Sequence, residues 1–227
     1  MDYSEVIKTV ILVTGGGLSE KIDNVRSIKN KSTGELAKVI SEKLVKEFYR
    51  DVYFLHTEDI ICPPNVKSIK INDILHLKAE LNELLKTKPI KAVVHAMAVS
   101  DYHVEGIYKN GEIIPIKSKL DSSEERVLLS LKRNPKIISM IKKFNPRVKL
   151  IGFKLTDGKT EEEQIKIAIN QIEKNNCDYV LVNDIFGIFN TKSEQLHKAM
   201  LINKNGEIVD KFNTKEEIAN KICEVTI

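Results

Sequence analysis

Short apolar runs alternate with amphipathic segments along most of the chain, and this alternation predicts strands and helices in turn. Apolar runs predict buried strands at 10–13, 52–55, 66–71, 91–99, 148–155 and 179–182. Helical spacing of apolar residues predicts helices at 32–48, 73–85, 135–144 and 161–174, with a last helix from Thr214. Strands that alternate with helices predict an α/β fold with a Rossmann-like, doubly wound, mostly parallel sheet covered on both faces.

Two parts of the chain depart from this alternation. Residues 102–130 lack the apolar periodicity of the flanking helices and strands, and they contain glycine, proline and several lysines. We therefore expect a small antiparallel excursion with a flexible flap around 103–125. Near the end, strands at 198–202 and 207–211 predict a β-hairpin that turns at Asn205-Gly206 and precedes the last helix. Without long linkers or repeats, residues 1–227 are expected to form a single domain.

The ends of the predicted strands indicate where a ligand would bind. In an open parallel sheet, ligands lie at the carboxyl ends of the strands. Gly15–Gly17, Ser100-Asp101, Phe153-Lys154 and Asn183-Asp184 each follow or end a predicted strand. We therefore expect these four segments to converge on one cleft.

Composition narrows the classes of function. The net charge is +4, with 36 basic and 32 acidic residues mixed along the chain, and no basic tract with aromatic residues favours a nucleic-acid partner. Cys62, Cys177 and Cys223 fit neither a disulfide framework nor a zinc spacing. The N-terminus does not resemble a signal peptide, and no apolar run approaches the roughly 20 residues that cross a bilayer. We expect a cytoplasmic protein without a membrane partner.

The glycine run is the first candidate for chemistry. Thr14-Gly15-Gly16-Gly17 resembles the start of a dinucleotide fingerprint, but Glu20 stands where the third glycine would be. The second predicted strand also does not end on an acidic residue, so nicotinamide binding is disfavoured. The glycines fit a tight turn about as well as they fit a phosphate cradle.

Asn30-Lys31-Ser32-Thr33-Gly34, at a predicted helix start, is a second candidate. Free backbone N–H groups, short hydroxyls and a glycine suit a phosphate oxyanion. Ser32 followed by Glu35 equally fits a capping box, which needs no ligand. Arg26, shortly upstream, adds a bidentate partner for phosphate or carboxylate.

Several other polar residues can be interpreted in structural or functional terms. Asp101 would orient a metal or a ribose, or simply form a turn after its strand. Asn134-Pro135 is typical of a helix start, with asparagine as the cap and proline at the first position. The five histidines show no ligand spacing, so no protein metal site is predicted, and His95 is expected in the core or near the site.

Eight motifs occur in a fixed order: 14–17 with Glu20, 22–26, 28–34, 98–102, 119–120 with Ser122, 132–137, 151–154 and 182–185. Together they resemble the phosphopantothenate–cysteine ligase family. The resemblance implies a cytoplasmic enzyme of coenzyme A biosynthesis, in a standalone form without the fused decarboxylase. It would join 4′-phosphopantothenate and cysteine through an acyl nucleotidylate, with CTP or ATP as co-substrate and Mg²⁺ as cofactor. A homodimer and a separate phosphopantothenoylcysteine decarboxylase in the pathway are also implied.

The resemblance also implies roles for residues. Asn30 would stabilise the acyl nucleotidylate, and Lys119 would be a catalytic residue on the flap. Arg26, from the neighbouring subunit, would bind the substrate, as would Ala98 and Asn183. The nucleotide would contact Gly15, Gly16, Ser32, Gly34, Asp101, Asn134, Pro135, Lys136, Ile137 and Phe153.

Two departures from the family pattern leave questions open. Two-function bacterial members carry two lysines where Gln171 and Asn175 stand here, and Lys31 replaces a frequent histidine. The triphosphate contacts and the choice between CTP and ATP therefore stay open. The alternatives to a ligase are a non-catalytic nucleotide- or phosphopantothenate-binding module and a Rossmann-type oxidoreductase.

Overall fold

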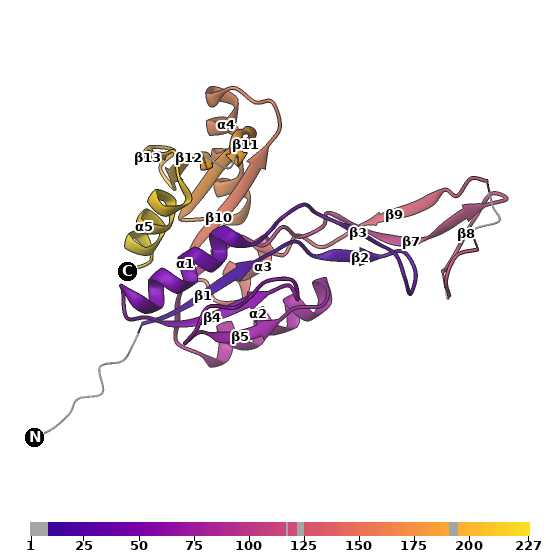
Figure 1. Cartoon of the computed structure of the whole chain (residues 1–227), viewed down its shortest axis with the longest axis horizontal. Coiled ribbons are helices and arrows are strands. Elements are labelled where there is room, and N and C mark those ends of the chain that lie inside the picture. The colour runs from indigo at the N-terminus through magenta and orange to yellow at the C-terminus, as the bar shows by residue number, and fades with distance from the viewer. Residues whose placement is uncertain (1–8, 117, 122–124, 191–194) are drawn as a thin grey trace, which may run out of the picture.

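The computed structural model describes residues 9–116, 118–121, 125–190 and 195–227 (Figure 1). Its strands are β1 (Val10–Gly15), β2 (Ser19–Lys21), β3 (Ser27–Lys29), β4 (Asp51–His56), β5 (Lys67–Lys70), β6 (Ile90–His95), β7 (Tyr102–Lys109), β8 (Glu112–Ile114), β9 (Leu129–Arg133), β10 (Lys149–Thr156), β11 (Tyr179–Asn190), β12 (Gln195–Asn203) and β13 (Ile208–Phe212). Its helices are α1 (Glu35–Lys46), α2 (Ile74–Thr87), α3 (Ile138–Phe144), α4 (Glu161–Asn175) and α5 (Lys215–Thr226).

The main sheet has eight strands in the order β13-β12-β11-β10-β6-β1-β4-β5. The six strands from β5 to β11 run parallel, and β12 and β13 add antiparallel strands at one edge. In chain order the parallel strands are arranged 3-2-1-4-5-6, which is the Rossmann order, and the direction of winding reverses between β1 and β6. The predicted doubly wound sheet and the C-terminal hairpin with its helix are confirmed.

Both faces of this sheet are buried. Leu12 of β1 packs in a core with α2, α3 and α4, whereas its neighbours Ile11 and Val13 pack in a second core with α1 and α5. Successive side chains of a strand point to opposite faces, so a strand between two helical layers must be apolar at every position. This explains why the strands read as continuous apolar runs.

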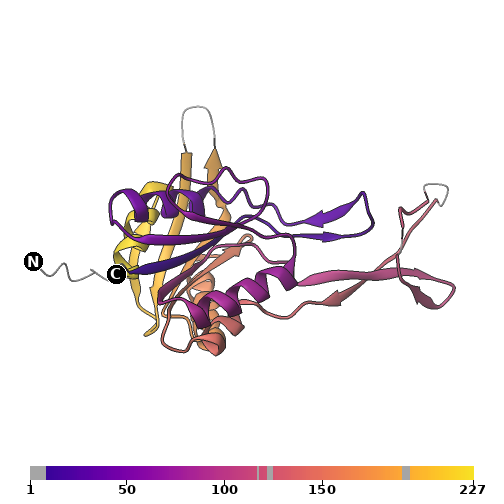
Figure 2. The same ribbon diagram turned by 90° about the horizontal axis from the view of Figure 1, so that it is seen from below.

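Two small antiparallel sheets leave the body on the same side and form what we call the arm: the β2–β3 hairpin and the β8-β7-β9 sheet (Figures 1 and 2). The predicted antiparallel excursion is confirmed in β7, β8 and β9. The β2–β3 hairpin was not predicted, because its strands are short and polar and β3 is fully exposed. Of the predicted flap at 103–125, residues 117 and 122–124, including Ser122, lie outside the described residues, and its flexibility stays a prediction.

Helix α1 begins at a glycine. Gly34 occupies the N-cap position with φ +69° and has no side chain, and the Glu35 N–H donates to Thr33 Oγ1 at 3.4 Å, so the capping box predicted for Ser32 and Glu35 is wrong. A Cβ on Gly34 would lie 2.1 Å from Ile60 Cδ1, so the packing of the loop against the helix start requires glycine there.

Other predicted boundaries also change. Helix α3 begins at Ile138, so Asn134 is not its cap and Pro135 is not its first residue; the Asn134 side chain is bonded to other segments instead. Strand β6 ends at His95 rather than at Val99, whereas β11 runs on to Asn190 because it pairs with β12. Tertiary hydrogen bonds, which local pattern does not report, set these ends.

The N-termini of α4 and α1 give a prediction about the free energy of unfolding. Thr160 and Glu163 form a complete capping box at α4, with Thr160 Oγ1 accepting from the Glu163 N–H at 3.3 Å. Thr160→Ala should therefore lower the free energy of unfolding by about 1 kcal/mol. Ser32→Ala, at the start of α1 where Gly34 rather than this serine is the N-cap, should change it by less than about 0.5 kcal/mol. Urea unfolding without ligand measures both, and equal losses would contradict the assignment.

Candidate active site

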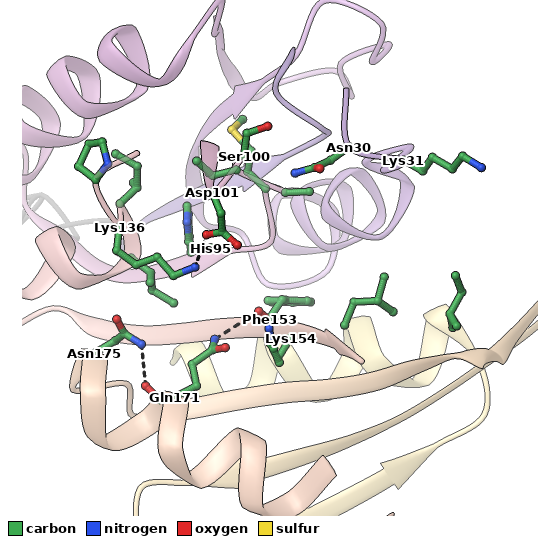
Figure 3. Close-up of a pocket in the computed structure, with 18 residues that line it drawn as sticks. Asn30, Lys31, His95, Ser100, Asp101, Lys136, Phe153, Lys154, Gln171 and Asn175 are labelled. Carbon is green, nitrogen blue, oxygen red and sulfur yellow. Dashed lines mark hydrogen bonds and ion pairs between the residues drawn. The ribbon is translucent and has the colours of Figure 1, made fainter. Parts of the chain in front are cut away.

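A cavity of about 410 Å³ lies at the carboxyl ends of β6 and β10, beside the point where the strand order reverses. Figure 3 shows it between the N-terminal segments and the β10–α4 layer. The walls come from segments far apart in the chain: Asn30 and Lys31, His95 and 97–101, 135–138, 153–155, Gln171 and Asn175 of α4, and Ile185.

Two of the four segments expected to converge do line this cavity. Ser100-Asp101 and Phe153-Lys154 are in its walls, as predicted. Gly15–Gly17 and Asn183-Asp184 are not, and that part of the expectation is wrong. A Cβ on Gly15 would lie 2.5 Å from Ala37 Cβ, so this glycine lets α1 pack closely on β1.

Asn183 and Asp184 have structural contacts instead. Asn183 Nδ2 lies 3.3 Å from His197 Nε2. The Asp184 carboxylate accepts hydrogen bonds from the Gly158, Lys159 and Phe186 N–H groups, and these bonds, with the Thr156 hydroxyl, hold its pKa down to about 2. Asp184 therefore fixes the loop that precedes α4.

The residues singled out from the sequence divide into two groups. Those that line the cavity are Asn30, Ala98, Asp101, Pro135, Lys136, Ile137 and Phe153. Those that do not are Gly15, Gly16, Arg26, Ser32, Gly34, Lys119, Asn134 and Asn183. The binding roles of both groups stay predictions, because placement in a wall is not contact with a ligand.

The charges of the cavity favour an anionic ligand. Lys31, Lys136 and Lys154 are in its walls, and Asp101 is the one carboxylate among the residues that line it. The side chains of Asp101 and Lys136 point toward one another and form an ion pair, but each is more than half exposed (Figure 3). An exposed pair contributes little stability, so Lys136 can exchange this partner for a phosphate at small cost.

Helix α4 contributes neutral amides to the cavity wall. Gln171 Nε2 donates to the Phe153 carbonyl at 3.2 Å, and Asn175 Nδ2 donates to the Gln171 carbonyl at 2.8 Å (Figure 3). Lys174 is exposed and does not line the cavity. Gln171 and Asn175, which stand where two-function members carry lysines, both line the cavity.

His95, at the end of β6, is a buried histidine of the cavity wall. Its Nδ1 lies 2.8 Å from Thr14 Oγ1, and that hydroxyl also accepts from the Met97 N–H at 3.3 Å. Burial lowers the pKa of His95 to about 4, so the ring is neutral near pH 7.

The described residues contain no group of three or more His, Cys, Asp or Glu side chains that could hold a metal ion. In the cavity, Asp101 alone offers a carboxylate. This donor set fits a Mg²⁺ ion that is carried by a nucleotide and coordinated mainly by phosphate oxygens and water. Among the described helices, none has the length and apolar character needed to cross a membrane.

Some lining residues had no binding role assigned from the sequence. Met97 and Leu155 are apolar and were read only as strand residues, whereas Val99 and Lys154 stood within motifs, and only the strand-end position of Lys154 was expected to face the cleft. The signal for Lys154 was its place at the end of a buried strand, where ligands of parallel sheets bind. Apolar lining residues carry no such signal, because core and pocket positions have the same composition.

In comparisons with known proteins, a family model and individual sequence relatives of this chain agree with one another. The family model described as DNA/pantothenate metabolism flavoprotein C-terminal domain matches residues 7–227. The coenzyme A biosynthesis bifunctional protein CoaBC of Thermococcus kodakarensis is 31% identical over 213 residues, which are 93% of this chain and 49% of that protein. The chain thus spans about half the length of the curated relatives it matches.

Solved structures share the fold. A DNA/pantothenate metabolism flavoprotein from Streptococcus pneumoniae superposes with a TM-score of 0.85 and 35% identity, covering 96% of this chain and 97% of that chain. A Cab2 mutant in complex with phosphopantothenate-cysteine superposes with a TM-score of 0.75, covering 96% of this chain and 86% of that chain. Its identity is 14%, so that likeness concerns the fold alone.

The buried His95 generates a pH prediction. Its pKa is about 4 in the folded protein against an ordinary value of 6.5, so the unfolded chain binds the proton first as the pH falls. The contribution of His95 to the free energy of unfolding is fully present above about pH 6.5. It is lost toward pH 4, by at most about 3 kcal/mol. His95→Gln should therefore lose less stability across this window than the unchanged protein, in urea unfolding at several pH values.

The comparison is between His95→Gln and the unchanged protein at the same pH values. His197, whose pKa burial also lowers to about 4, acts in the same window, so His95→Gln reduces the dependence without abolishing it. An unchanged slope in His95→Gln would contradict the prediction.

Proposed function

The chain belongs to the DNA/pantothenate metabolism flavoprotein C-terminal domain family, and we propose that it is a phosphopantothenate–cysteine ligase of coenzyme A biosynthesis. The observation that carries the proposal is the assembly of one cavity from the ordered ligase motifs. Asn30, Asp101 and Phe153 come from three of these motifs, and the fold brings them together where the strand order reverses. A three-lysine wall beside a single carboxylate suits substrates that carry phosphate and carboxylate groups.

The proposed reaction has two steps. A carboxylate oxygen of 4′-phosphopantothenate forms a bond to the α-phosphorus of the nucleoside triphosphate, and the bond to pyrophosphate breaks. The cysteine amine then forms the amide bond to the acyl carbon, loses a proton, and releases the nucleoside monophosphate. The site must hold two anions together and stabilise the charge that develops on the acyl oxygen.

The lining residues suit these tasks. The Asn30 amide would donate to the acyl oxygen, because a neutral N–H donor stabilises developing negative charge without repelling the substrate. Lys136 and Lys154 would contact phosphate oxygens, and the Phe153 segment would contact the base. When bound with the nucleotide beside Asp101, Mg²⁺ would neutralise phosphate charge.

The nucleotide is CTP or ATP. Gln171 and Asn175 are neutral, so the three lysines of the cavity walls would supply the phosphate contacts that α4 lacks. Some residues predicted to contact the nucleotide do not line the cavity, and they would then support the lining residues instead. They are Gly15, Gly16, Ser32, Gly34 and Asn134.

We also propose a homodimer in which the arm of one protomer completes the site of its partner. Arg26 lies in the turn of the β2–β3 hairpin, and Lys119 directly precedes Leu120, whose backbone contacts that turn; neither lines the cavity of its own chain. The Asp23 carboxylate accepts from the Leu120 N–H at 3.1 Å, and Arg26 Nη2 donates to the Leu120 carbonyl at 2.8 Å. Arg26 and the residue after Lys119 are thus held together, and the two cations would reach a partner's site as one unit.

The domain organisation, cellular location and pathway of the protein are also part of the proposal. Residues 1–227 would act as a single ligase domain in the cytoplasm, and a phosphopantothenoylcysteine decarboxylase would use the product. A non-catalytic binding module is the second candidate, since it would need the same cavity. An oxidoreductase has less support, because Glu20 replaces the third glycine of the dinucleotide fingerprint.

The ligase is tested by pyrophosphate release from purified protein with 4′-phosphopantothenate, cysteine and Mg²⁺, with CTP and ATP in parallel. We expect release that requires 4′-phosphopantothenate, and the ratio of the two rates gives the nucleotide preference. Folded protein that binds nucleotide but releases no pyrophosphate with either one would overturn the ligase in favour of the binding module.

Mixed dimers test Asn30 and Arg26 together. Asn30→Ala and Arg26→Ala should each be nearly inactive alone, the first through loss of the acyl-oxygen donor and the second through loss of a substrate contact. If Arg26 serves the partner's site, a randomly mixed dimer population should recover about one quarter of the original activity, because each mixed dimer keeps one intact site.

The matched control is a mixture of Asn30→Ala with Asp101→Ala, two residues that line the same cavity. Both sites of that mixed dimer stay defective, so no activity should return. Recovery in the control, or none with Arg26→Ala, would contradict the shared site, and full activity of Asn30→Ala would remove its role.

A further inference from the structure

A polar cluster lies where the arm joins the cavity and does not line it: the buried Glu20 on β2 and Asn134 after β9, with the half-buried His103 on β7. Glu20 is 9% exposed and Asn134 is 7% exposed. Buried polar side chains are costly unless their hydrogen bonds are satisfied, so this cluster calls for a structural or functional reason.

Asn134 is the centre of the cluster. Its Nδ2 donates to Glu20 Oε1 at 3.0 Å and to the Ser100 carbonyl at 3.1 Å. Its Oδ1 lies 2.8 Å from His103 Nδ1, which must therefore donate. Its backbone N–H donates to the Asp101 carbonyl at 2.8 Å. Both amide hydrogens and the oxygen are used, which fixes the side chain in one orientation.

These bonds join segments that form the cavity. Ser100 and Asp101 are in one wall, and Pro135, Lys136 and Ile137, which follow Asn134 directly, are in another. Asn134 therefore sets the spacing between the two walls, and the Lys136–Asp101 ion pair spans the same two walls.

Glu20 connects a third segment to this centre. It pairs with Ile28 across the β2–β3 hairpin, and β3 leads directly to Asn30 and Lys31 in the cavity wall. Burial raises the pKa of Glu20 above its usual range, more than the hydrogen bond from Asn134 lowers it. Burying a carboxyl group costs free energy. That Glu20 is buried despite this cost indicates that its hydrogen bond to Asn134 holds these segments in position.

We propose that Glu20 is a positioning residue that fixes the nucleotide-binding walls through its hydrogen bond to Asn134, with His103 holding the other end of the same amide. Its effect on nucleotide binding rests on the proposed function, whereas its effect on the walls does not. The property required of Glu20 is a hydrogen-bond-accepting oxygen at that position, and a glutamine supplies the same oxygen without the charge.

The test compares Glu20→Ala with the conservative Glu20→Gln. Glu20→Ala should weaken equilibrium binding of the Mg–nucleotide by about tenfold and raise its KM similarly, with a much smaller change in kcat. Glu20→Gln should stay within about twofold of the unchanged protein. Glu105→Ala is the matched control, since Glu105 bonds to Ser130 and Lys132 within the arm and does not bond to Asn134.

A second readout requires no substrate. Exchange of the Asn134 backbone amide hydrogen, which is bonded to the Asp101 carbonyl, should accelerate by about tenfold in Glu20→Ala. It should stay unchanged in Glu20→Gln and Glu105→Ala. A protein that binds no nucleotide would contradict the proposed function, while the exchange rates would still decide the role of Glu20.

Unchanged exchange and binding in Glu20→Ala would overturn the proposal. A Glu20→Gln variant as impaired as Glu20→Ala would also overturn it, because the charge rather than the acceptor oxygen would then matter. Thermal unfolding of each variant shows whether it is folded, and the comparison remains decisive through Glu20→Gln if Glu20→Ala does not fold.

Discussion

The reversal of strand order between β1 and β6 constrains the rest of this structure. The chain winds outward from β1 through β4 to β5, and then crosses back to β6 and continues to β10 and β11. Loops that leave the two central strands therefore diverge to opposite sides, and a space opens at their carboxyl ends. The cavity lies beside this space, and two of its walls are formed by the ends of β6 and β10 and the residues that follow β6.

Close packing around β1 makes this arrangement possible. Gly15 lets Ala37 of α1 approach the strand, and Gly16, at φ +96°, lies so near Thr57 that a Cβ would be 2.1 Å from the threonine oxygen. The glycine run thus brings α1 and the loop after β4 onto the end of β1. Asn30 and Lys31, which precede this packed junction, are placed at the cavity as a consequence.

The arm extends the site beyond the body of the molecule. The β2–β3 hairpin connects the buried Glu20–Asn134 cluster at its base with Asp23 and Arg26 at its turn, where both contact the Leu120 backbone. One hairpin is therefore bonded to the walls of its own cavity at one end and carries cationic groups away from that cavity at the other. This division is consistent with a site shared between two protomers.

The sequence by itself determined the sheet, the two helical layers and the terminal hairpin, because continuous apolar runs and helical spacing reflect burial on one or two faces. It also singled out Asp101, Lys136 and Phe153 from strand ends and motif order, and the structure places all three in the walls of one cavity. Only the tertiary structure decided that the glycines serve packing, that Asn134 is an interior link rather than a helix cap, and that Arg26 lies outside its own cavity. Those outcomes depend on contacts between residues far apart in the chain, and local sequence pattern carries no information about which partners such residues meet.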